Sequence, residues 1–241
     1  MRPYFQILLT TAMILLVTEM PAQKLSLTVG AGTGTYGMKE LRELNSVFQK
    51  AVPFETRVVS DFPPFLNYSA SLRVKEDNFY YGLFYSFQTT GSRISARDYS
   101  GEYVLDMVLN GNSAGFSAGF VIPSGGRLNY SVSAVCGVIF TRLKLSEDFV
   151  VTDTEILNNK FRARAKNPFA GPVLAVSCPV RNFDFGFSAG YLFQITRGIL
   201  SGTGDNSGIL TNPSTGGDVS AGWNGLRAEL TAGVRFGKKE E

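Results

Sequence analysis

The sequence predicts a closed antiparallel β-barrel of eight strands that crosses a membrane. Apolar and polar residues alternate with a period of two along most of the chain, which is typical of strands with one polar and one apolar face. No segment after the N-terminus is apolar enough for a membrane helix, and tight turns alternate with long polar connections. Hydrophobic residues make up 44% of the chain and charged residues 18%, which excludes a disordered protein.

The N-terminus has the three parts of a secretory signal peptide. Met1 and Arg2 give a short positive start, residues 5–17 form an apolar run, and small residues follow at 20–23. The run is shorter than the roughly 20 apolar residues that a membrane anchor needs. We therefore expect residues 1–22 to be cleaved, which leaves residues 23–241 as the barrel domain.

Eight segments carry the alternation. Each has one apolar face and one face of serine, threonine, glycine, amide and charged residues. An even number of such segments is typical of a bacterial membrane barrel. The eight segments span residues 25–32, 66–74, 79–87, 103–122, 128–141, 161–180, 183–196 and 226–236.

Two of these segments change the parity of their apolar positions. In one, odd-numbered apolar positions end at Leu109 and even-numbered ones begin at Phe116. In the other, the change falls between Ala165 and Leu174. We expect a glycine-containing break in the former and a bulge or bend at residues 167–172 in the latter.

The connections between the segments are of two kinds, which alternate strictly. Such sorting is typical of bacterial outer-membrane barrels, with short periplasmic turns at one rim and long extracellular loops at the other. A soluble β-sandwich would have no reason to sort its loops in this way. A soluble exported barrel that carries a lipid stays an alternative. The tight connections are 75–78, 123–126 and 180–182, and the long ones are 33–64, 91–101, 143–160 and 198–222.

The chain also resembles a known family. Residues 37–45, 61–71 and 91–103 are similar to outer-membrane β-barrel domain proteins, the porin-like small barrels grouped near OmpX and the OmpA transmembrane domain. The resemblance implies a barrel in the outer membrane of a Gram-negative envelope and no particular activity. One departure is that Phe236 is followed by residues 237–241, whereas such barrels often end on an aromatic residue.

The segment from Gly32 to Gly37 fits the pattern G-x-G-x-x-G, and Asp61 lies roughly where a ribose-binding acid would be sought. However, strand 25–29 alternates with serine and threonine, whereas the central parallel strand of a dinucleotide fold is apolar on both faces. No further βαβ units follow Asp61. We therefore interpret the glycines as small rim and lumen positions, and we expect no cofactor.

A short amphipathic helix is predicted in the first long connection. Its apolar residues recur at the helical spacing of 3.6, and Lys39 and Glu43 form an i,i+4 pair on the outer side. We expect the apolar face to pack on the barrel rim; a lid, a partner-binding element or a membrane-surface helix are the alternatives. This face comprises Met38, Leu41, Leu44 and Phe48.

Charged residues on the polar strand faces predict a network inside the barrel. An eight-stranded barrel is only wide enough to be filled by side chains, and buried charges there must be paired. We expect a structural salt-bridge network, with conductance or gating as the alternative. Specific pairs cannot be assigned because the stagger between strands is unknown. The residues concerned are Arg73, Asp106, Arg227, Glu229 and Arg235.

Catalysis has little support in this sequence. The chain contains no histidine, which removes serine–histidine–acid and cysteine–histidine arrangements and histidine-based zinc sites. Cys136 and Cys178 lack a basic neighbour in sequence, and we expect both to be unpaired thiols. We therefore predict no catalytic residue, no metal site and no enzymatic activity.

The predicted function is a structural or surface-interaction role in the outer membrane. A narrow pore for ions or small solutes is the first alternative, and a soluble exported lipid-binding barrel is the second. The expected partners are outer-membrane lipids or lipopolysaccharide, the barrel-assembly machinery, and surface ligands of the long loops. A net charge of +3, dispersed along the chain, argues against nucleic acid. We expect a monomer.

Overall fold

The computed structural model describes residues 24–52, 55–97, 99, 101–124, 126–151, 154–203 and 207–236, without the side chains of 24 and 154–156. The predicted signal peptide lies outside the described residues. The elements, in order, are β1 Lys24–Gly34, α2 Lys39–Ala51, β2 Arg57–Asp61, β3 Phe65–Glu76, β4 Phe79–Arg97, β5 Gly101–Pro123, β6 Asn129–Val151, β7 Thr154–Val180, β8 Phe183–Gln194, β9 Ser201–Gly202 and β10 Gly225–Phe236.

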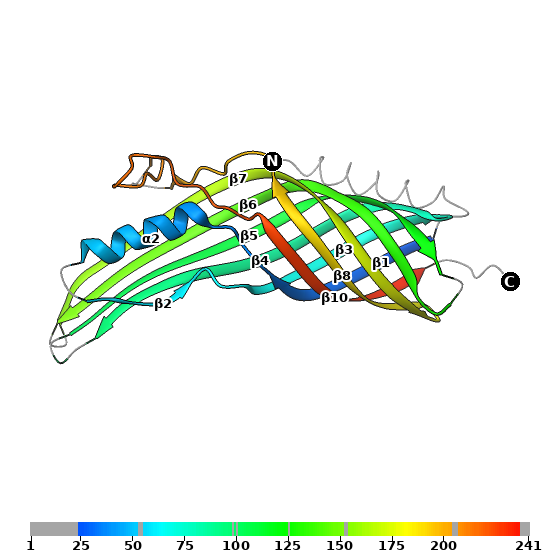
Figure 1. Ribbon diagram of the computed structural model, residues 1–241, viewed down its shortest axis with the longest axis horizontal. Helices are drawn as coiled ribbons and strands as arrows, with labels where there is room; N and C mark the ends of the chain where they lie inside the picture. The colour runs from blue at the N-terminus through cyan, green and yellow to red at the C-terminus, as the bar shows by residue number, and fades with distance from the viewer. Residues whose placement is uncertain are drawn as a thin grey trace, which may run out of the picture.

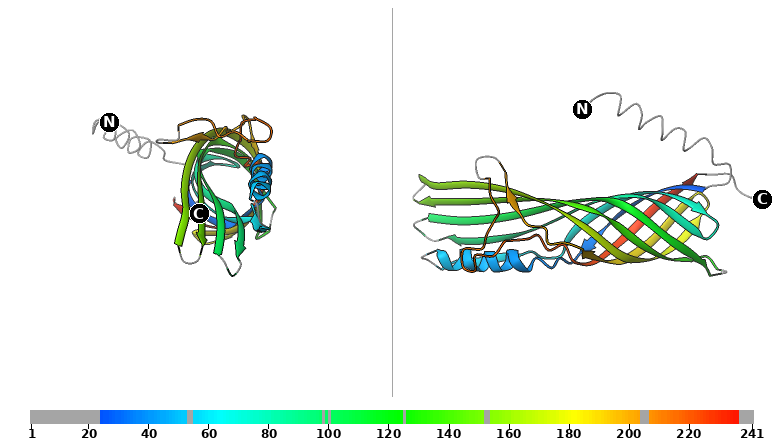
Figure 2. Two further views of the ribbon diagram at one scale, coloured as in Figure 1. Left: turned by 90° about the vertical axis from the view of Figure 1, so that its left-hand side faces the viewer. Right: turned by 90° about the horizontal axis from the view of Figure 1, so that it is seen from above.

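Eight antiparallel strands form a closed ring, as the sequence predicts. The hydrogen-bonded order is β1-β3-β4-β5-β6-β7-β8-β10, and β10 pairs with β1 from Leu25 opposite Phe236 to Gly34 opposite Arg227. Figure 2 shows the ring from one end. The two remaining strands pair at its margin, β2 with β4 and β9 with β7. Closure leaves no unpaired edge within the ring.

The eight strands differ greatly in length. Strands β1, β3, β8 and β10 have 11 or 12 residues, whereas β4, β5, β6 and β7 have 19, 23, 23 and 27. The four long strands therefore continue beyond the ring as a curved sheet, which is visible in Figure 1. We call this the extension sheet; it comprises residues 89–97, 101–110, 141–151 and 154–167.

Most of two segments that were predicted to be loops belongs to the strands of the extension sheet. Residues 91–97 and 101 belong to strands, and so do residues 143–151 and 154–160. They look like loops in the sequence because their outward side chains are polar. The long-loop end of the barrel is thus mostly paired strand, with the remaining long connections at residues 35–64 and 195–224.

Where the apolar residues of β5 change from odd to even positions, the backbone stays regular and only the chemistry of the two faces changes. Odd-numbered residues point inward along the whole strand, from Leu105 in the extension sheet to Ser117 in the ring. The register with β6 runs without a shift from Gly101 to Pro123. The predicted glycine-containing break is therefore wrong.

The predicted bulge at residues 167–172 is wrong for the same reason. Strands β6 and β7 stay in register through this segment, and their one shift lies between Phe149 and Val150. Inward positions are apolar in the extension sheet, as at Ala163, whereas outward positions are apolar in the ring, as at Leu174.

The outer face of the ring is an exposed apolar belt. Leu230 is 71% exposed and Phe116 is 66% exposed, so these side chains have little contact with the rest of the chain. An apolar surface of this extent marks a membrane or partner-binding face. A lipid-carrying soluble barrel would need the opposite orientation. The belt includes Leu27, Val29, Leu72, Leu83, Phe116, Phe120, Val132, Leu174, Phe185, Phe187, Phe193, Leu226 and Leu230.

The main apolar core lies beside the extension sheet. Leu41 and Leu44 of α2 are fully buried, and they belong to one cluster with Met107, Leu109 and Leu143 of the sheet. Burial of each such side chain contributes about 1.5–3 kcal/mol. Met38, just before α2, is also buried, and Phe48 is partly buried against the same cluster, so the apolar face of the helix packs beside the sheet. No helix in the described part of the chain is long and apolar enough to cross a membrane.

Candidate functional site

Trp223 closes the lumen at the end nearest the extension sheet. The side chain is fully buried, and its Nε1 donates a hydrogen bond of 2.8 Å to the Thr141 hydroxyl on β6. Its ring meets that of Tyr36 edge-on, with the centroids 5.1 Å apart. Gly111 provides the space, because a Cβ there would lie 2.9 Å from Cζ2 of Trp223. A residue of the last long connection is therefore fixed inside the barrel mouth.

Arg227 holds this closure to the barrel wall. Its guanidinium lies 4.7 Å from the centroid of the Tyr36 ring. Nε donates to Gln88 Oε1 at 2.9 Å, and Nη2 donates to the Trp223 carbonyl at 2.7 Å. The residue lies in the lumen as predicted, but its hydrogen-bond partners are neutral.

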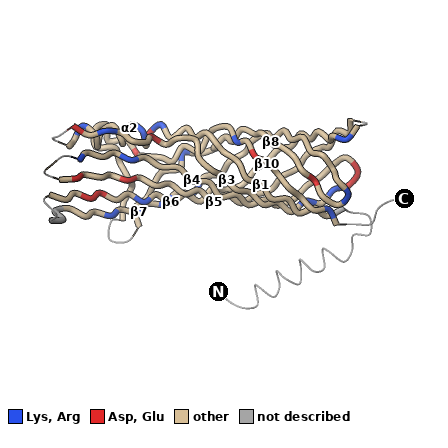
Figure 3. Tube along the Cα trace, turned by 90° about the horizontal axis from the view of Figure 1, so that it is seen from below, with Lys and Arg blue, Asp and Glu red and all other residues tan. Residues whose placement is uncertain are grey.

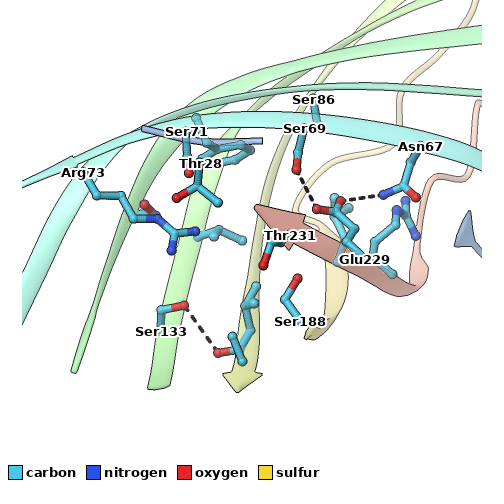
Figure 4. Close-up of a pocket in the computed structure, with 18 of the residues that line it drawn as sticks. Thr28, Asn67, Ser69, Ser71, Arg73, Ser86, Ser133, Ser188, Glu229 and Thr231 are labelled. Carbon is cyan, nitrogen blue, oxygen red and sulfur yellow. Dashed lines mark hydrogen bonds between the residues drawn. The ribbon is translucent and has the colours of Figure 1, made fainter. Parts of the chain in front are cut away.

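Glu229 is likewise held by neutral donors. Asn67 Nδ2 and the Ser69 hydroxyl each donate to a different carboxylate oxygen at 2.6 Å, as Figure 4 shows. Gly30 on β1 leaves room for the carboxylate, since a Cβ there would lie 2.7 Å from Oε2 of Glu229. These groups line a cavity of about 150 Å³.

A second cavity of about 190 Å³ lies toward the short-turn end of the lumen. Arg235 on its wall pairs with Asp184, with Nε 3.1 Å from Oδ2, and donates through Nη2 to the Arg181 carbonyl. Arg73, on the same wall, lies 5.1 Å from the centroid of the Tyr80 ring. Arg235 and Asp184 thus form a salt bridge inside the lumen.

The predicted charge network is therefore partly wrong. Asp106 lies on the outer face of the extension sheet, where Arg93 Nε and Nη2 donate to its two oxygens at 2.6 and 2.7 Å. It faces outward because the inward parity of β5 is odd throughout. Asp184 and Lys75 were missed, although the alternation of residues 183–196 had already placed Asp184 on a polar strand face.

A second candidate site lies on the outer face of the extension sheet. Arg142 of β6 is directly opposite Arg164 of β7, and Lys144 is opposite Arg162. Like charges directly opposite on neighbouring strands are destabilising. We call this group the basic ladder; its members, all exposed, are Arg142, Lys144, Lys160, Arg162, Arg164 and Lys166.

The basic ladder has few compensating charges. Within the described ranges no member of it forms a salt bridge. Asp148 and Asp106 lie toward the far end of the sheet, and Asp106 is already paired with Arg93. At the end near the apolar belt, Lys166 Nζ lies 5.8 Å from the centroid of the Phe140 ring. The prediction from sequence missed the basic ladder because it assigned residues 143–160 to a loop.

The remaining polar groups give no catalytic arrangement. Cys136 and Cys178 are both free thiols, as predicted. The part of the chain that the structure describes holds no group of three histidine, cysteine, aspartate or glutamate residues that could bind a metal. Burial and the nearby Glu147 carboxylate raise the pKa of Tyr103, which donates to Glu147 at 3.0 Å and stays neutral.

Comparison with known proteins identifies the fold. No protein-family model matches the chain, and no curated protein matches it in sequence. A major outer membrane protein from Thermus thermophilus has a similar structure, with a TM-score of 0.53 and 12% identity, over 89% of this chain and 100% of that one.

Two further solved structures are more distant. Ail, the attachment invasion locus protein of Yersinia pestis, in complex with the heparin analogue sucrose octasulfate, gives a TM-score of 0.43 at 14% identity over 89% of this chain and 99% of that one. Neisserial surface protein A gives 0.40 at 10% identity, over 90% and 99%. The similarity to the Thermus thermophilus protein shows that the chain has the fold of an outer-membrane β-barrel, in agreement with the predicted resemblance.

Proposed function

We propose that this chain is an integral outer-membrane protein with a structural or surface-interaction role and no enzymatic activity. A cleaved signal peptide at residues 1–22 would export it. The short turns would face the periplasm, and the extension sheet would project from the cell surface. Its fold is that of proteins from this membrane, and its long connections lie at one end, as in bacterial barrels.

The observation that carries this proposal is that the ring and the extension sheet have opposite side-chain chemistry on their inner and outer faces. In the ring the outward residues are apolar and the lumen is polar, whereas the extension sheet has an apolar core and a charged outer face. Figure 3 shows the charged residues gathered toward the two ends of the molecule. A tilted membrane strand needs about 9–11 residues, and the short strands of the ring have 11 or 12. The length and apolar outer face of the ring therefore suit the bilayer, and the charged outer face of the extension sheet suits an aqueous environment.

The basic ladder gives the surface role a chemical partner. On β6 the outward residues change from Phe140 to Arg142, so the ladder begins where the apolar belt ends. Phosphate groups of outer-leaflet lipids, including lipopolysaccharide, lie at this level. Lysine and arginine bind phosphate through charge-assisted hydrogen bonds. Such contacts would remove the repulsion between Arg142 and Arg164 across the strand pair.

The pore alternative has weaker support. Trp223 and Arg227 occupy the mouth of the lumen and are bonded to its wall. The apolar core continues directly beyond them. A solute passing through the barrel would have to displace these two side chains and then the apolar core.

Fractionation and a heat-modifiability gel test the proposed location. We expect the mature protein in the carbonate-washed outer-membrane fraction, with a folded band that shifts in mobility after boiling. Recovery in the soluble periplasmic fraction would contradict the proposal, because the apolar belt would then need a different cover.

A further inference from the structure

We propose that the short-turn end of the lumen binds a small oxyanion of the phosphate or sulfate class. The site is formed by Arg73, Lys75 and Arg235 around the cavity of about 190 Å³. This inference needs only the closed barrel and does not depend on the role of the basic ladder. It goes beyond a structural salt-bridge network, because in such a network the charged side chains would pair with one another and no bound ligand would be needed.

The strand register brings two of the cationic residues together. Arg73 of β3 and Arg235 of β10 are both directly opposite Ser26 of β1. Two strand spacings separate their backbones, or about 10 Å. Both side chains line the cavity, and Figure 4 shows Arg73 pointing into the lumen. Two guanidinium groups can therefore approach one anion from different sides.

The charges in the lumen do not balance. With Lys75 left aside, the described inward-facing cations Arg73, Arg227 and Arg235 still outnumber the anions Asp184 and Glu229 by one. Asp184 is paired with Arg235, and Glu229 accepts from neutral donors in the other cavity. Uncompensated charge in a low-dielectric interior is costly.

Arg73 is the group in which this imbalance is localised. No carboxylate among the described residues lies within salt-bridge distance of it, and its guanidinium contacts the face of the Tyr80 ring. Its Nε is buried without a hydrogen-bond partner. A buried donor of this kind points to a missing acceptor.

The cavity fits a small oxyanion better than a cation or an apolar molecule. Its volume is several times the roughly 30 Å³ of one water molecule, which leaves room for a tetrahedral anion and its hydration. Hydroxyl groups of Ser26, Ser131 and Ser177 also line it. Guanidinium binds oxyanions through paired N–H donors. Because Trp223 closes the other end, the anion would enter from the short-turn end.

Titration with inorganic phosphate tests the site. The refolded protein in a phosphate-free, non-ionic detergent would be followed by NMR of the arginine Nε–Hε resonances, with sulfate as a second probe. We expect a saturable shift of the Arg73 resonance. In calorimetry, Arg73→Gln should weaken phosphate binding at least about tenfold. The matched control is Arg93→Gln, whose guanidinium is already paired with Asp106 on the outer face of the extension sheet, and it should leave phosphate binding in the lumen unchanged.

A second variant keeps the test valid if Arg73→Gln does not fold. Ser177→Asp places a carboxylate on the wall of the same cavity, where it can pair with Arg73. We expect this variant to give a heat-modifiable band and to lose phosphate binding. The proposal is wrong if the wild-type Arg73 resonance does not move. It is equally wrong if phosphate binding is the same in wild type, Arg73→Gln and Ser177→Asp.

Discussion

Trp223 Nε1 donates a hydrogen bond of 2.8 Å to the Thr141 hydroxyl, and so fixes a residue of the last long connection within the mouth of the barrel. The contact lies at the boundary between two regions whose interiors differ in polarity. Toward the short turns the lumen is polar, and toward the extension sheet the interior is an apolar core. Because the indole belongs to the apolar core and its N–H bonds to the wall, one side chain joins the two regions.

Truncation of this side chain should destabilise the protein strongly. Trp223→Ala removes a fully buried indole and should lower the free energy of unfolding by about 3–5 kcal/mol. Thr141→Val removes only the hydrogen bond and should cost about 1 kcal/mol. Denaturant unfolding in one detergent or lipid system measures both. Equal costs for the two variants would show that the indole does not pack as described.

The closed mouth also predicts that the protein does not conduct. Planar-bilayer recordings of the wild type should give no stable single-channel conductance, since Trp223 and Arg227 occupy the lumen. Boiled protein is the control for detergent artefacts. A stable conductance from folded wild-type protein would favour the pore.

A charged substitution in the apolar belt should be costly, whereas one on the extension sheet should not. Leu230→Arg places a charge at a strand position that is 71% exposed in the middle of the belt, and should cost about 2–4 kcal/mol near the membrane midplane. Val104→Arg is the matched control, because Val104 faces outward opposite Asp148 on the extension sheet. Unfolding in lipid vesicles compares them. A negligible cost for Leu230→Arg would argue against a bilayer around the belt.

Neutralising the basic ladder should weaken binding to phosphate-bearing lipid. We expect Lys144→Gln combined with Arg162→Gln and Arg164→Gln to reduce the association of lipopolysaccharide with the protein and its dependence on salt. The control is Arg93→Gln, on the same face but paired with Asp106. In phosphatidylcholine alone, the triple variant should be no less stable than the wild type, because repulsion across the strand pair is removed. Unchanged lipopolysaccharide binding would refute this role.

The contact between α2 and the last long connection should be lost at low pH. Burial raises the pKa of Glu40, but hydrogen bonds from Ser220 and Arg197 outweigh it and hold the pKa below the usual value. A lowered folded-state pKa gives stability that is present above the unfolded value of about 4.3 and is lost as pH falls through the folded value. The wild type should therefore exceed Glu40→Gln in thermal stability at pH 7, with the difference vanishing in acid. A difference independent of pH would contradict this account.

The ring was predictable from the sequence because alternation is a local signal. Segments such as 79–87 and 226–236 show it without interruption, and each became a strand of the ring. The parity of apolar residues says which positions share a face, but not whether that face is inside. For this reason a glycine-containing break was predicted within one segment, between Leu109 and Phe116, which point in opposite directions on one continuous strand.

The candidate sites depend on register, which the sequence does not encode locally. Arg73 and Arg235 lie 162 positions apart, and only the pairing of both strands with β1 brings them opposite Ser26. The same holds for Arg142 and Arg164, whose alignment requires residues 143–151 and 154–160 to be strand. Asp106 was misplaced because the apolar residues Leu105 and Met107 beside it were assigned to the outer face, whereas they point inward in the extension sheet. Arg227 and Glu229 were placed correctly because the alternation of their strand has no inversion.

The accessibility of single labelled residues to membrane and water probes tests the central claim most directly. In a Cys136→Ala and Cys178→Ala background, one nitroxide label would be placed at Leu230, Thr231 or Lys144 of the protein in lipid vesicles. We predict that Leu230 is accessible to oxygen dissolved in the bilayer and Thr231 is not, while Lys144 is accessible to a water-soluble relaxation agent. Water-like accessibility at both Leu230 and Lys144 would contradict a membrane boundary between the ring and the extension sheet.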